Sequence, residues 1–316
     1  MRRRAHRRRP RPTTTNLSRT SHMTAEHATD IDYIDHTVLI TTDIAAASAR
    51  YEALGFTLSP LSPHHLAERP GGPPLPTCTA NRCAYFGQSF IELLGIVDPA
   101  APDPWGVHRL RRTYRGLLMT LGSREIQATA ERLHATGLAS TGIRALEREV
   151  STPDGPRTVR ADSVRIDAAH TPEGALQATQ HFTPQYVHQP HHLDHPNGAL
   201  GLHSVLLVVP DDEIDDHEER YARILDADVW IDGPKRVLPL RHGRVEIVPR
   251  SSLGDFLPGH AVPSLPLLAA HTVAVRDLTA ARELVERNMI ATRTTPGGFY
   301  VTAEDACGVP LAFTQN

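Results

Sequence analysis

The stretch Ile34–Ser59, IDHTVLITTDIAAASARYEALGFTLS, decides the fold. It begins with a short alternating run that carries a histidine near its start, and an amphipathic helix follows. His36 and Val38 share one face of this run, because successive strand residues alternate between the two faces. Asp43 can cap the helix and Gly55 can end it. The stretch therefore predicts a strand followed directly by a helix.

The same strand–helix pattern occurs three more times. It starts again at Gly201 (GLHSVLLVVPDD) and at Ala269 (AAHTVAVRDLTAARELVERNMIATRT), each time with a histidine in the strand. It also starts at Arg115 (RGLLMTLGSREIQATAERLHATGLAST), without one. A unit of this kind cannot bury its own apolar face, so repeated units imply modules that share faces. We expect an α+β fold of paired βαβββ modules, with four modules in two domains.

The spacing of these units also predicts the layout of the chain. A Pro-rich loop at 60–76 interrupts module one, and a connector at 251–266 separates modules three and four. The later strands of the first two modules are expected at 78–87, 89–98, 158–167 and 175–182. The domain limits that follow are 30–187 for the first domain, 188–199 for a His- and Pro-rich bridge, and 200–316 for the second domain.

The N-terminal segment differs in composition from the rest. Its first 22 residues contain eight arginines and no acidic residue. It lacks an apolar central region, which argues against a secretory signal, and like-charge runs of this kind rarely fold. We expect 1–29 to be disordered and dispensable, with Met23 an alternative start to Met1. Setting these eight charges aside from the formal net charge of −3 leaves −11 for the remainder, so nucleic-acid binding is not expected.

Hydropathy and cysteine content indicate whether the protein is a membrane protein and in which compartment it is found. The chain is 40% hydrophobic, enough for packed cores, yet it has no long apolar run and its mean hydropathy is −0.31. A membrane protein is therefore not expected. Cys78, Cys83 and Cys307 are odd in number and lack C-x-x-C spacing. They predict free thiols in a reducing compartment and a cytoplasmic protein.

Several motifs of the first half resemble the vicinal oxygen chelate (VOC) superfamily, and more specifically its glyoxalase-like domain proteins. The resemblance covers 34–201, whereas the second half resembles the superfamily only in its βαβββ pattern. One departure is Cys78, which stands where a glycine is expected. The matching motifs are IDH at Ile34–His36, TAN at Thr79–Asn81, FGQSFIELLG at Phe86–Gly95, QHFTP at Gln180–Pro184 and HPNGA at His195–Ala199.

The resemblance implies a metal site, because the first and last strands of paired VOC modules line a common cup. It implies His36 and Glu92 as ligands from module one. Module two offers Gln180 and His181 on its last strand, on opposite faces, and we favour His181. The result is a two-histidine, one-carboxylate set for a divalent ion, which is zinc, iron, manganese or nickel. Glu92 would also act as the catalytic base.

Other histidines have plainer interpretations. A single histidine on a strand is more often a hydrogen-bonded core residue than a ligand. His203, Glu246 and His271 occupy strand positions that allow a second His–Glu–His set. The resemblance argues against this set, because the last strand of module four ends on Gln315 and carries no carboxylate. We therefore interpret the second half as chiefly structural.

The loop and bridge histidines leave alternatives open. His188, His191 and His192 fit a solvated connector, whereas His195 in HPNGA could line the cup. In the long loop, His64 and His65 either reach over the cup as acid–base groups or lie exposed. The sequence does not separate these two readings.

Two functions fit the sequence. The first is a metal-dependent VOC-type enzyme, either a glyoxalase-like lyase or isomerase or a ring-opening dioxygenase, that acts on a small oxygenated organic molecule. The second is a non-catalytic protein that sequesters a drug or metabolite. Aromatic residues make up only 5% of the chain, which is low for a stacking pocket and favours the enzyme. A homodimer that completes a cup also fits the pattern.

Overall fold

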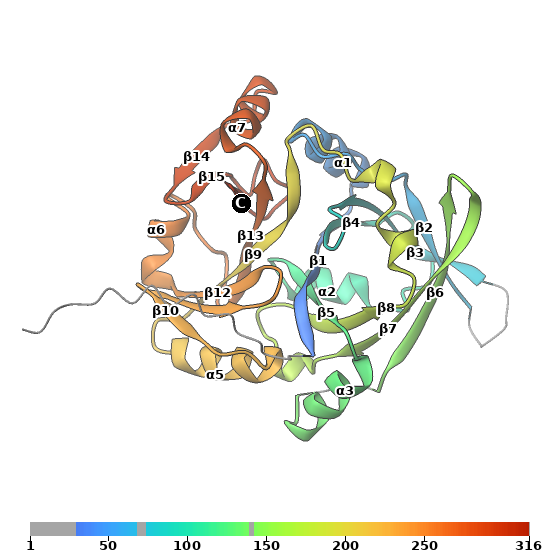
Figure 1. The fold of residues 1–316 in the computed structure, drawn as a ribbon, viewed down its shortest axis with the longest axis horizontal. Helices are drawn as coiled ribbons and strands as arrows, with labels where there is room; N and C mark the ends of the chain where they lie inside the picture. Colours follow the sequence, from blue (N-terminus) through green and yellow to red (C-terminus); the bar gives the residue numbers. More distant parts are fainter. Residues whose placement is uncertain (1–29, 68–73, 139–141, 316) are drawn as a thin grey trace, which may run out of the picture.

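The structure is a computed structural model that describes residues 30–67, 74–138 and 142–315. The N-terminal segment 1–29, for which the sequence predicts disorder, lies outside these residues. Met1 and Met23, the two alternative starts, both belong to that segment. Within the described ranges, no helix is long and apolar enough to cross a membrane. The described residues form two β-sheets, with helices on their outer sides (Figure 1).

The first half of the chain forms one eight-stranded sheet, ordered β2-β3-β4-β1-β5-β8-β7-β6. Its elements are β1 (Ile31–Thr41), α1 (Ile44–Ala53), β2 (Ser62–Ala67), β3 (Pro74–Tyr85), β4 (Phe90–Ile96), α2 (Val107–Thr113), β5 (Leu118–Ser123), α3 (Ile126–Ala135), β6 (Arg144–Thr152), β7 (Gly155–Arg165), η1 (Ala168–His170), β8 (Leu176–His181), α4 (Pro184–Val187) and η2 (Pro190–His192).

The second half forms a second eight-stranded sheet, ordered β10-β11-β12-β9-β13-β16-β15-β14. Its elements are β9 (Ala199–Val209), α5 (Ile214–Leu225), β10 (Trp230–Asp232), β11 (Lys235–Pro239), β12 (Arg244–Pro249), η3 (Arg250–Ser252), α6 (Leu253–Phe256), β13 (Leu267–Val275), α7 (Leu278–Arg287), β14 (Thr292–Thr295), β15 (Gly298–Val301) and β16 (Leu311–Gln315).

The predicted α+β fold of four βαβββ modules in two pairs is confirmed. In each module the first strand pairs in parallel with the last, as β1 does with β4 and β9 with β12. The two modules of a pair meet where their first strands run antiparallel, β1 against β5 and β9 against β13. The helices α2, α4 and α6 are additions between modules. Each pair of modules therefore forms one continuous eight-stranded sheet, and one face of that sheet packs against the shared core.

Local sequence explains the start and end of helix α1. The Asp43 side chain accepts a hydrogen bond from the Ala46 N–H at 2.9 Å, so the predicted N-cap is confirmed. Gly55 ends the helix with φ +87°, and an added Cβ there would lie 2.8 Å from Asn197. Asn197 donates from Nδ2 to the Leu54 carbonyl at 2.9 Å. The HPNGA motif thus fastens the chain between the two sheets to the end of α1.

One predicted loop contains a strand. The Pro-rich segment 60–76 includes β2, which pairs antiparallel with β3 from Ser62 opposite Asn81 onward. The prediction was wrong because proline is tolerated on an edge strand, where one side of the backbone needs no partner, and β2 is an edge strand. The sequence also missed β6, the other edge of this sheet, whose side chains are mostly exposed and therefore show no apolar pattern.

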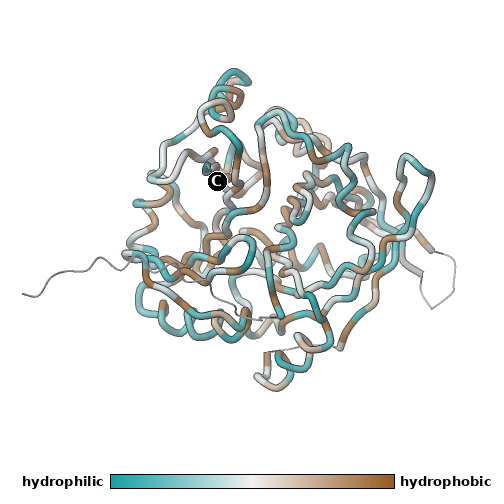
Figure 2. Tube along the Cα trace, viewed as in Figure 1, coloured by the Kyte–Doolittle hydropathy of each residue, from teal (hydrophilic) through white to brown (hydrophobic). Residues whose placement is uncertain are grey.

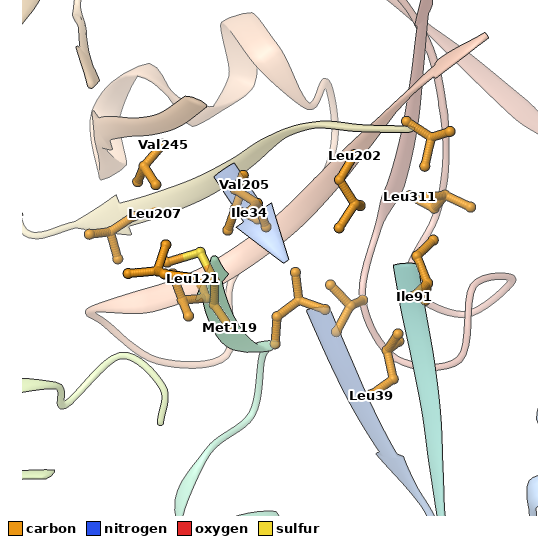
Figure 3. Close-up of a cluster of buried hydrophobic side chains, with 14 of the residues drawn as sticks. Ile34, Leu39, Ile91, Met119, Leu121, Leu202, Val205, Leu207, Val245 and Leu311 are labelled. Carbon is orange, nitrogen blue, oxygen red and sulfur yellow. The ribbon is translucent and has the colours of Figure 1, made fainter. Parts of the chain in front are cut away.

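A shared hydrophobic core joins the two sheets (Figure 3). Figure 2 shows hydrophilic residues along outer elements such as α5, whereas apolar residues concentrate in the interior. Each fully buried aliphatic side chain stabilises the fold by roughly 1.5–3 kcal/mol relative to exposure. The residues labelled in Figure 3 come from both sheets: Ile34, Leu39, Ile91, Met119, Leu121, Leu202, Val205, Leu207, Val245 and Leu311.

The opposite face of each sheet, which we call the cup face, differs between the halves. In the second sheet an apolar part of this face is covered by the segment around α6, where Leu253 and Leu257 pack on Leu206 and Val208. The predicted connector 251–266 therefore fills this cup. In the first sheet the cup face has apolar clusters toward its two ends with polar side chains between them. The candidate site that the sequence predicts lies among these polar side chains.

Candidate functional site

Two neighbouring strands bring His36 and Glu92 together on the cup face of the first sheet. β1 and β4 pair in parallel with His36 opposite Phe90 and Val38 opposite Glu92. Nε2 of His36 lies 3.7 Å from Oε2 of Glu92, and the two side chains are 12% and 13% exposed. The His36 ring stacks on the Phe90 ring with centroids 4.3 Å apart. A nitrogen donor and an oxygen donor therefore meet at a position that solvent still reaches.

Glu92 is held from the neighbouring strand and from the far edge of the sheet. Asn81, on β3, donates from Nδ2 to Oε1 of Glu92 at 2.6 Å. Arg148, on β6, interacts electrostatically with Glu92 and hydrogen-bonds Tyr85. These contacts fix one carboxylate oxygen, and the other oxygen remains directed at His36.

The His36 ring is oriented by a chain of polar side chains. Its Nδ1 lies 3.2 Å from Oδ1 of Asp35, and a carboxylate only accepts, so Nδ1 carries the proton of this contact. Nε2 lies 3.0 Å from the Thr120 hydroxyl, which also accepts from Nε2 of Gln177 at 3.1 Å. The Thr120 hydroxyl can then donate to His36. The lone pair of His36 Nε2 then accepts this hydrogen bond, and Oε2 of Glu92 lies 3.7 Å from the same nitrogen.

A bulge in β1 turns Asp35 to the same side as His36. The β1–β5 register shifts between Ile34 and His36, and the Asp35 side chain is fully buried. Nε2 of His181 lies 3.0 Å from both Asp35 oxygens. Burial alone would raise the pKa of Asp35, but His181 and His36 lower it below its ordinary value. Burial likewise opposes the charged form of His181, yet Asp35 raises the pKa of His181. The two residues form a buried ion pair.

His181 and Gln180 face opposite sides of β8. Gln180 accepts at Oε1 from the Ile126 N–H at 3.1 Å and donates to the Arg124 carbonyl, both beside α3. His181 instead lies on the side of Asp35 and His36. Its Nδ1 is buried, and within the described ranges no hydrogen-bond partner contacts that atom.

The structure brings two of the three predicted ligands into contact, and the third lies beside Asp35 instead. His36 and Glu92 are adjacent, whereas His181 contacts Asp35. Across the described part of the chain, a set of three donor atoms within 4.8 Å of one another occurs only at Cys78, Asp103 and His108. Ligation by His36, Glu92 and His181 stays a prediction, and it requires His181 to move relative to the other two.

The remaining histidines of the first half have defined surroundings. Nδ1 of His64 lies 3.0 Å from the Thr79 hydroxyl, and burial lowers the pKa of His64. His65 is exposed. His188 lies edge-on to Phe90, and burial lowers its pKa to about 4. His188 is therefore neutral and belongs to the cup rather than to a solvated connector.

His195 has a structural role. Its Nδ1 accepts from the Thr57 N–H at 3.0 Å, and its Nε2 donates to the Tyr85 carbonyl at 2.8 Å. Both ring nitrogens are therefore occupied, and the side chain is buried beside Phe56 and Phe86. His195 fastens the bridge to the first sheet and does not line the polar part of the cup.

His203, Glu246 and His271 do not form a second centre. Glu246 is on the cup face of the second sheet, where Arg244 Nε and Lys235 Nζ lie 2.7 and 3.3 Å from its Oε1. His271 points the other way, into the domain interface, with Nδ1 2.8 Å from the Thr37 hydroxyl. Because the two side chains lie on opposite faces of the sheet, Glu246 and His271 do not contribute to one ligand cluster.

Comparison with known proteins agrees with this architecture. A sequence profile of the glyoxalase-like domain matches residues 34–225. A hypothetical protein from Staphylococcus aureus superposes with a TM-score of 0.58 at 11% identity, over 90% of this chain and all of its own. A Mn(II)-bound glyoxalase from Novosphingobium aromaticivorans gives 0.52 at 12% identity, over 91% of this chain and 83% of its own.

A mutant of 4-hydroxymandelate synthase from Streptomyces coelicolor superposes with a TM-score of 0.50 at 12% identity. That match spans 84% of this chain and 78% of the synthase. No curated protein sequence matches this chain. At such low identities the structural matches establish the fold, and the sequence profile establishes the family.

Proposed function

Because the chain belongs to the glyoxalase-like domain family of the VOC superfamily, we propose that it is a metal-dependent enzyme that acts on a small oxygenated organic molecule at the cup face of its first sheet. The observation that carries the proposal is the approach of His36 Nε2 to Glu92 Oε2 at 3.7 Å. The two donor atoms face the same space, which suits two ligands of one divalent ion, and the ion would replace the hydrogen bond that His36 Nε2 accepts from the Thr120 hydroxyl.

The chemistry of the donor set fits such an ion. Ligand bonds of about 2.0–2.2 Å from nitrogen and oxygen are compatible with donors this far apart. Asp35 accepts a hydrogen bond from Nδ1–H of His36, an arrangement that metal-binding histidines commonly have. The unpartnered Nδ1 of His181 is the third candidate donor, and it would have to lose the proton that it carries while His181 is paired as a cation with Asp35. When bound, the ion would polarise two substrate oxygens and stabilise negative charge that develops on them.

The protein's own groups would move the proton and hold the substrate. Glu92 is the proposed base, because Oε2 faces the cup while Asn81 holds Oε1. Arg148 supplies a fixed positive charge near Glu92, which would favour an anionic form of the substrate. Phe90 and Tyr85 form part of the apolar cluster on one side of Glu92 and would exclude water.

Two reaction types are possible for this enzyme, and measurement of oxygen consumption distinguishes them. A lyase or isomerase of the glyoxalase kind needs only proton transfer, so it should consume no oxygen. A ring-opening dioxygenase consumes one O₂ per substrate and requires a redox-active ion. Assays with a panel of α-oxo aldehyde thiol adducts and catechols, with an oxygen electrode on every sample, test the two directly.

A sequestering protein is the second candidate. The apolar clusters on both sides of the polar layer would suit binding of an amphipathic molecule without chemistry. Metal analysis of the purified protein distinguishes the candidates. We expect at least one tightly held divalent ion per chain, and activity that chelation removes and added metal restores. Binding of the panel compounds with unchanged affinity after chelation, and no turnover, would favour sequestration.

A further inference from the structure

A second cluster of metal-binding side chains lies at the start of α2, away from the cup. The loop before α2 folds back onto β3, since the Cys78 N–H donates to the Pro102 carbonyl at 2.9 Å. The Cys78 carbonyl accepts from the N–H groups of Val97 at 2.9 Å and Asp98 at 3.2 Å. This loop brings Asp103 and the first turn of α2 against the Cys78 thiol.

The side chains of Cys78, Asp103 and His108 converge. One donor atom from each lies within 4.8 Å of the other two. Cys78 is fully buried, and the other two residues are half-buried. Asp103 is already oriented, because its two oxygens accept from the N–H groups of Val107 at 2.8 Å and His108 at 3.0 Å. Each oxygen keeps a further lone pair for a ligand.

The His108 ring supplies an independent observation. Its Nε2 is buried, and within the part of the chain that the structure describes this atom has no hydrogen-bond partner. Leaving such a buried polar atom without a partner costs about 1–3 kcal/mol. A cation bound at Nε2 would give His108 the partner that this atom lacks.

We propose that the Cys78 thiolate, the Asp103 carboxylate and a His108 ring nitrogen bind one zinc-like divalent ion, separate from the centre at His36 and Glu92. Sulfur, nitrogen and oxygen donors from three residues suit zinc, with water in the fourth position. The thiol releases its proton to solvent as the sulfur–metal bond forms. The two negative ligands then balance the charge of the ion.

Two observations favour a bound metal over a reactive thiol. The Cys78 side chain is fully buried, so a substrate has poor access to its thiol. Cys78 and Asn81 are separated by an odd number of positions on β3, so their side chains point to opposite faces of the sheet. Asn81 contacts Glu92 on the cup face, and Cys78 therefore points to the other face. The Cys78 thiol therefore does not face a substrate held in the cup.

The position of the ion gives it a structural role. It would tie the first turn of α2 to β3. Further along, Leu110 of α2 and Tyr114 pack with Val38 and Leu118 in the apolar cluster on one side of the polar layer. The ion would thus hold closed one end of the cup of the first sheet.

Cobalt titration of the full-length protein tests the proposal, because a thiolate bound to Co²⁺ gives a near-ultraviolet charge-transfer band. After chelation, we expect one Co²⁺ per chain to produce this band and Zn²⁺ to abolish it. Cys78→Ser should remove the band. Asp103→Asn and His108→Gln should weaken Co²⁺ binding by at least the roughly 10–100-fold that loss of a supporting partner costs.

Matched variants make the outcome decisive. His36→Ala and Cys307→Ser should keep the band, which separates this site from the proposed active centre. Asp103→Asn keeps one side-chain oxygen that can accept from the first turn of α2, so it serves as the test if Cys78→Ser does not fold by circular dichroism. Absence of the band from the native protein, unchanged Co²⁺ affinity in folded Asp103→Asn, or loss of the band in Cys83→Ser instead would overturn the proposal.

Discussion

His271 should make the stability of the domain interface depend on pH. Its side chain is fully buried between the two sheets, with Nδ1 2.8 Å from the Thr37 hydroxyl and Nε2 3.5 Å from the Tyr51 hydroxyl. Burial lowers the pKa of His271 to about 3. The unfolded chain, in which histidine has a pKa of about 6.5, therefore binds a proton at mildly acidic pH that the folded chain does not.

The magnitude follows from this difference. Stability is unaffected above the unfolded pKa and falls by about 1.4 kcal/mol per pH unit between roughly pH 6.5 and 3. At about pH 4.5 His271 alone should reduce the free energy of unfolding by roughly 2.7 kcal/mol. In His271→Leu this loss disappears. The variant instead leaves the Thr37 hydroxyl unpaired, at a cost of about 1–3 kcal/mol that does not vary with pH.

Urea denaturation at about pH 7.5 and pH 4.5 measures the effect. The difference in unfolding free energy between native protein and His271→Leu should change by roughly 2–3 kcal/mol in favour of the variant at the lower pH. The exposed His134, replaced by Gln, serves as the matched control and should show no such change. Parallel pH dependence in native protein and His271→Leu would refute the reasoning.

Three further predictions follow from the same approach. Asp35→Asn removes the partner of a buried histidine, so NMR titration should show the pKa of His181 falling below its ordinary value. An unchanged pKa would exclude the ion pair. Arg220→Ala leaves the buried Glu173 carboxylate without its cation, although the Tyr221 hydroxyl still donates to it at 2.8 Å, and should cost about 3–5 kcal/mol at neutral pH. The cost should shrink as pH falls and Glu173 protonates, since burial raises its pKa. Equal destabilisation at about pH 5 and pH 7.5 would contradict this. Deletion of residues 1–22 should leave the melting temperature unchanged, and a fall of several degrees would show that this segment packs on the body.

The fold could be predicted because its strands are regular. The resemblance to the VOC superfamily implied that His36 and Glu92 share one face, and the parallel pairing of β1 with β4 brings the two side chains together. The helix cap at Asp43 was equally local. Elements with weak patterns escaped prediction, as β2 did among its prolines and β6 at an exposed edge.

The rest of the site depends on features that a sequence does not display. Strict alternation would put Asp35 on the face opposite His36, and only the bulge in β1 brings it to His181. Nothing in the pattern around Leu253 and Leu257 indicated that this connector fills the second cup. His271 occupied a strand position like that of His36, yet its face packs against the first sheet. Such outcomes are decided by packing between segments distant in sequence.

The central claim is that His36 and Glu92 hold a divalent ion, and Mn²⁺ binding followed by electron paramagnetic resonance tests it most directly. The chelated native protein should bind Mn²⁺, and His36→Ala and Glu92→Gln should each weaken that binding by at least roughly 10–100-fold. His203→Ala, at the equivalent strand of the second sheet, should bind Mn²⁺ like the native protein. Native-like Mn²⁺ affinity in folded Glu92→Gln, or loss of binding in His203→Ala, would contradict the account.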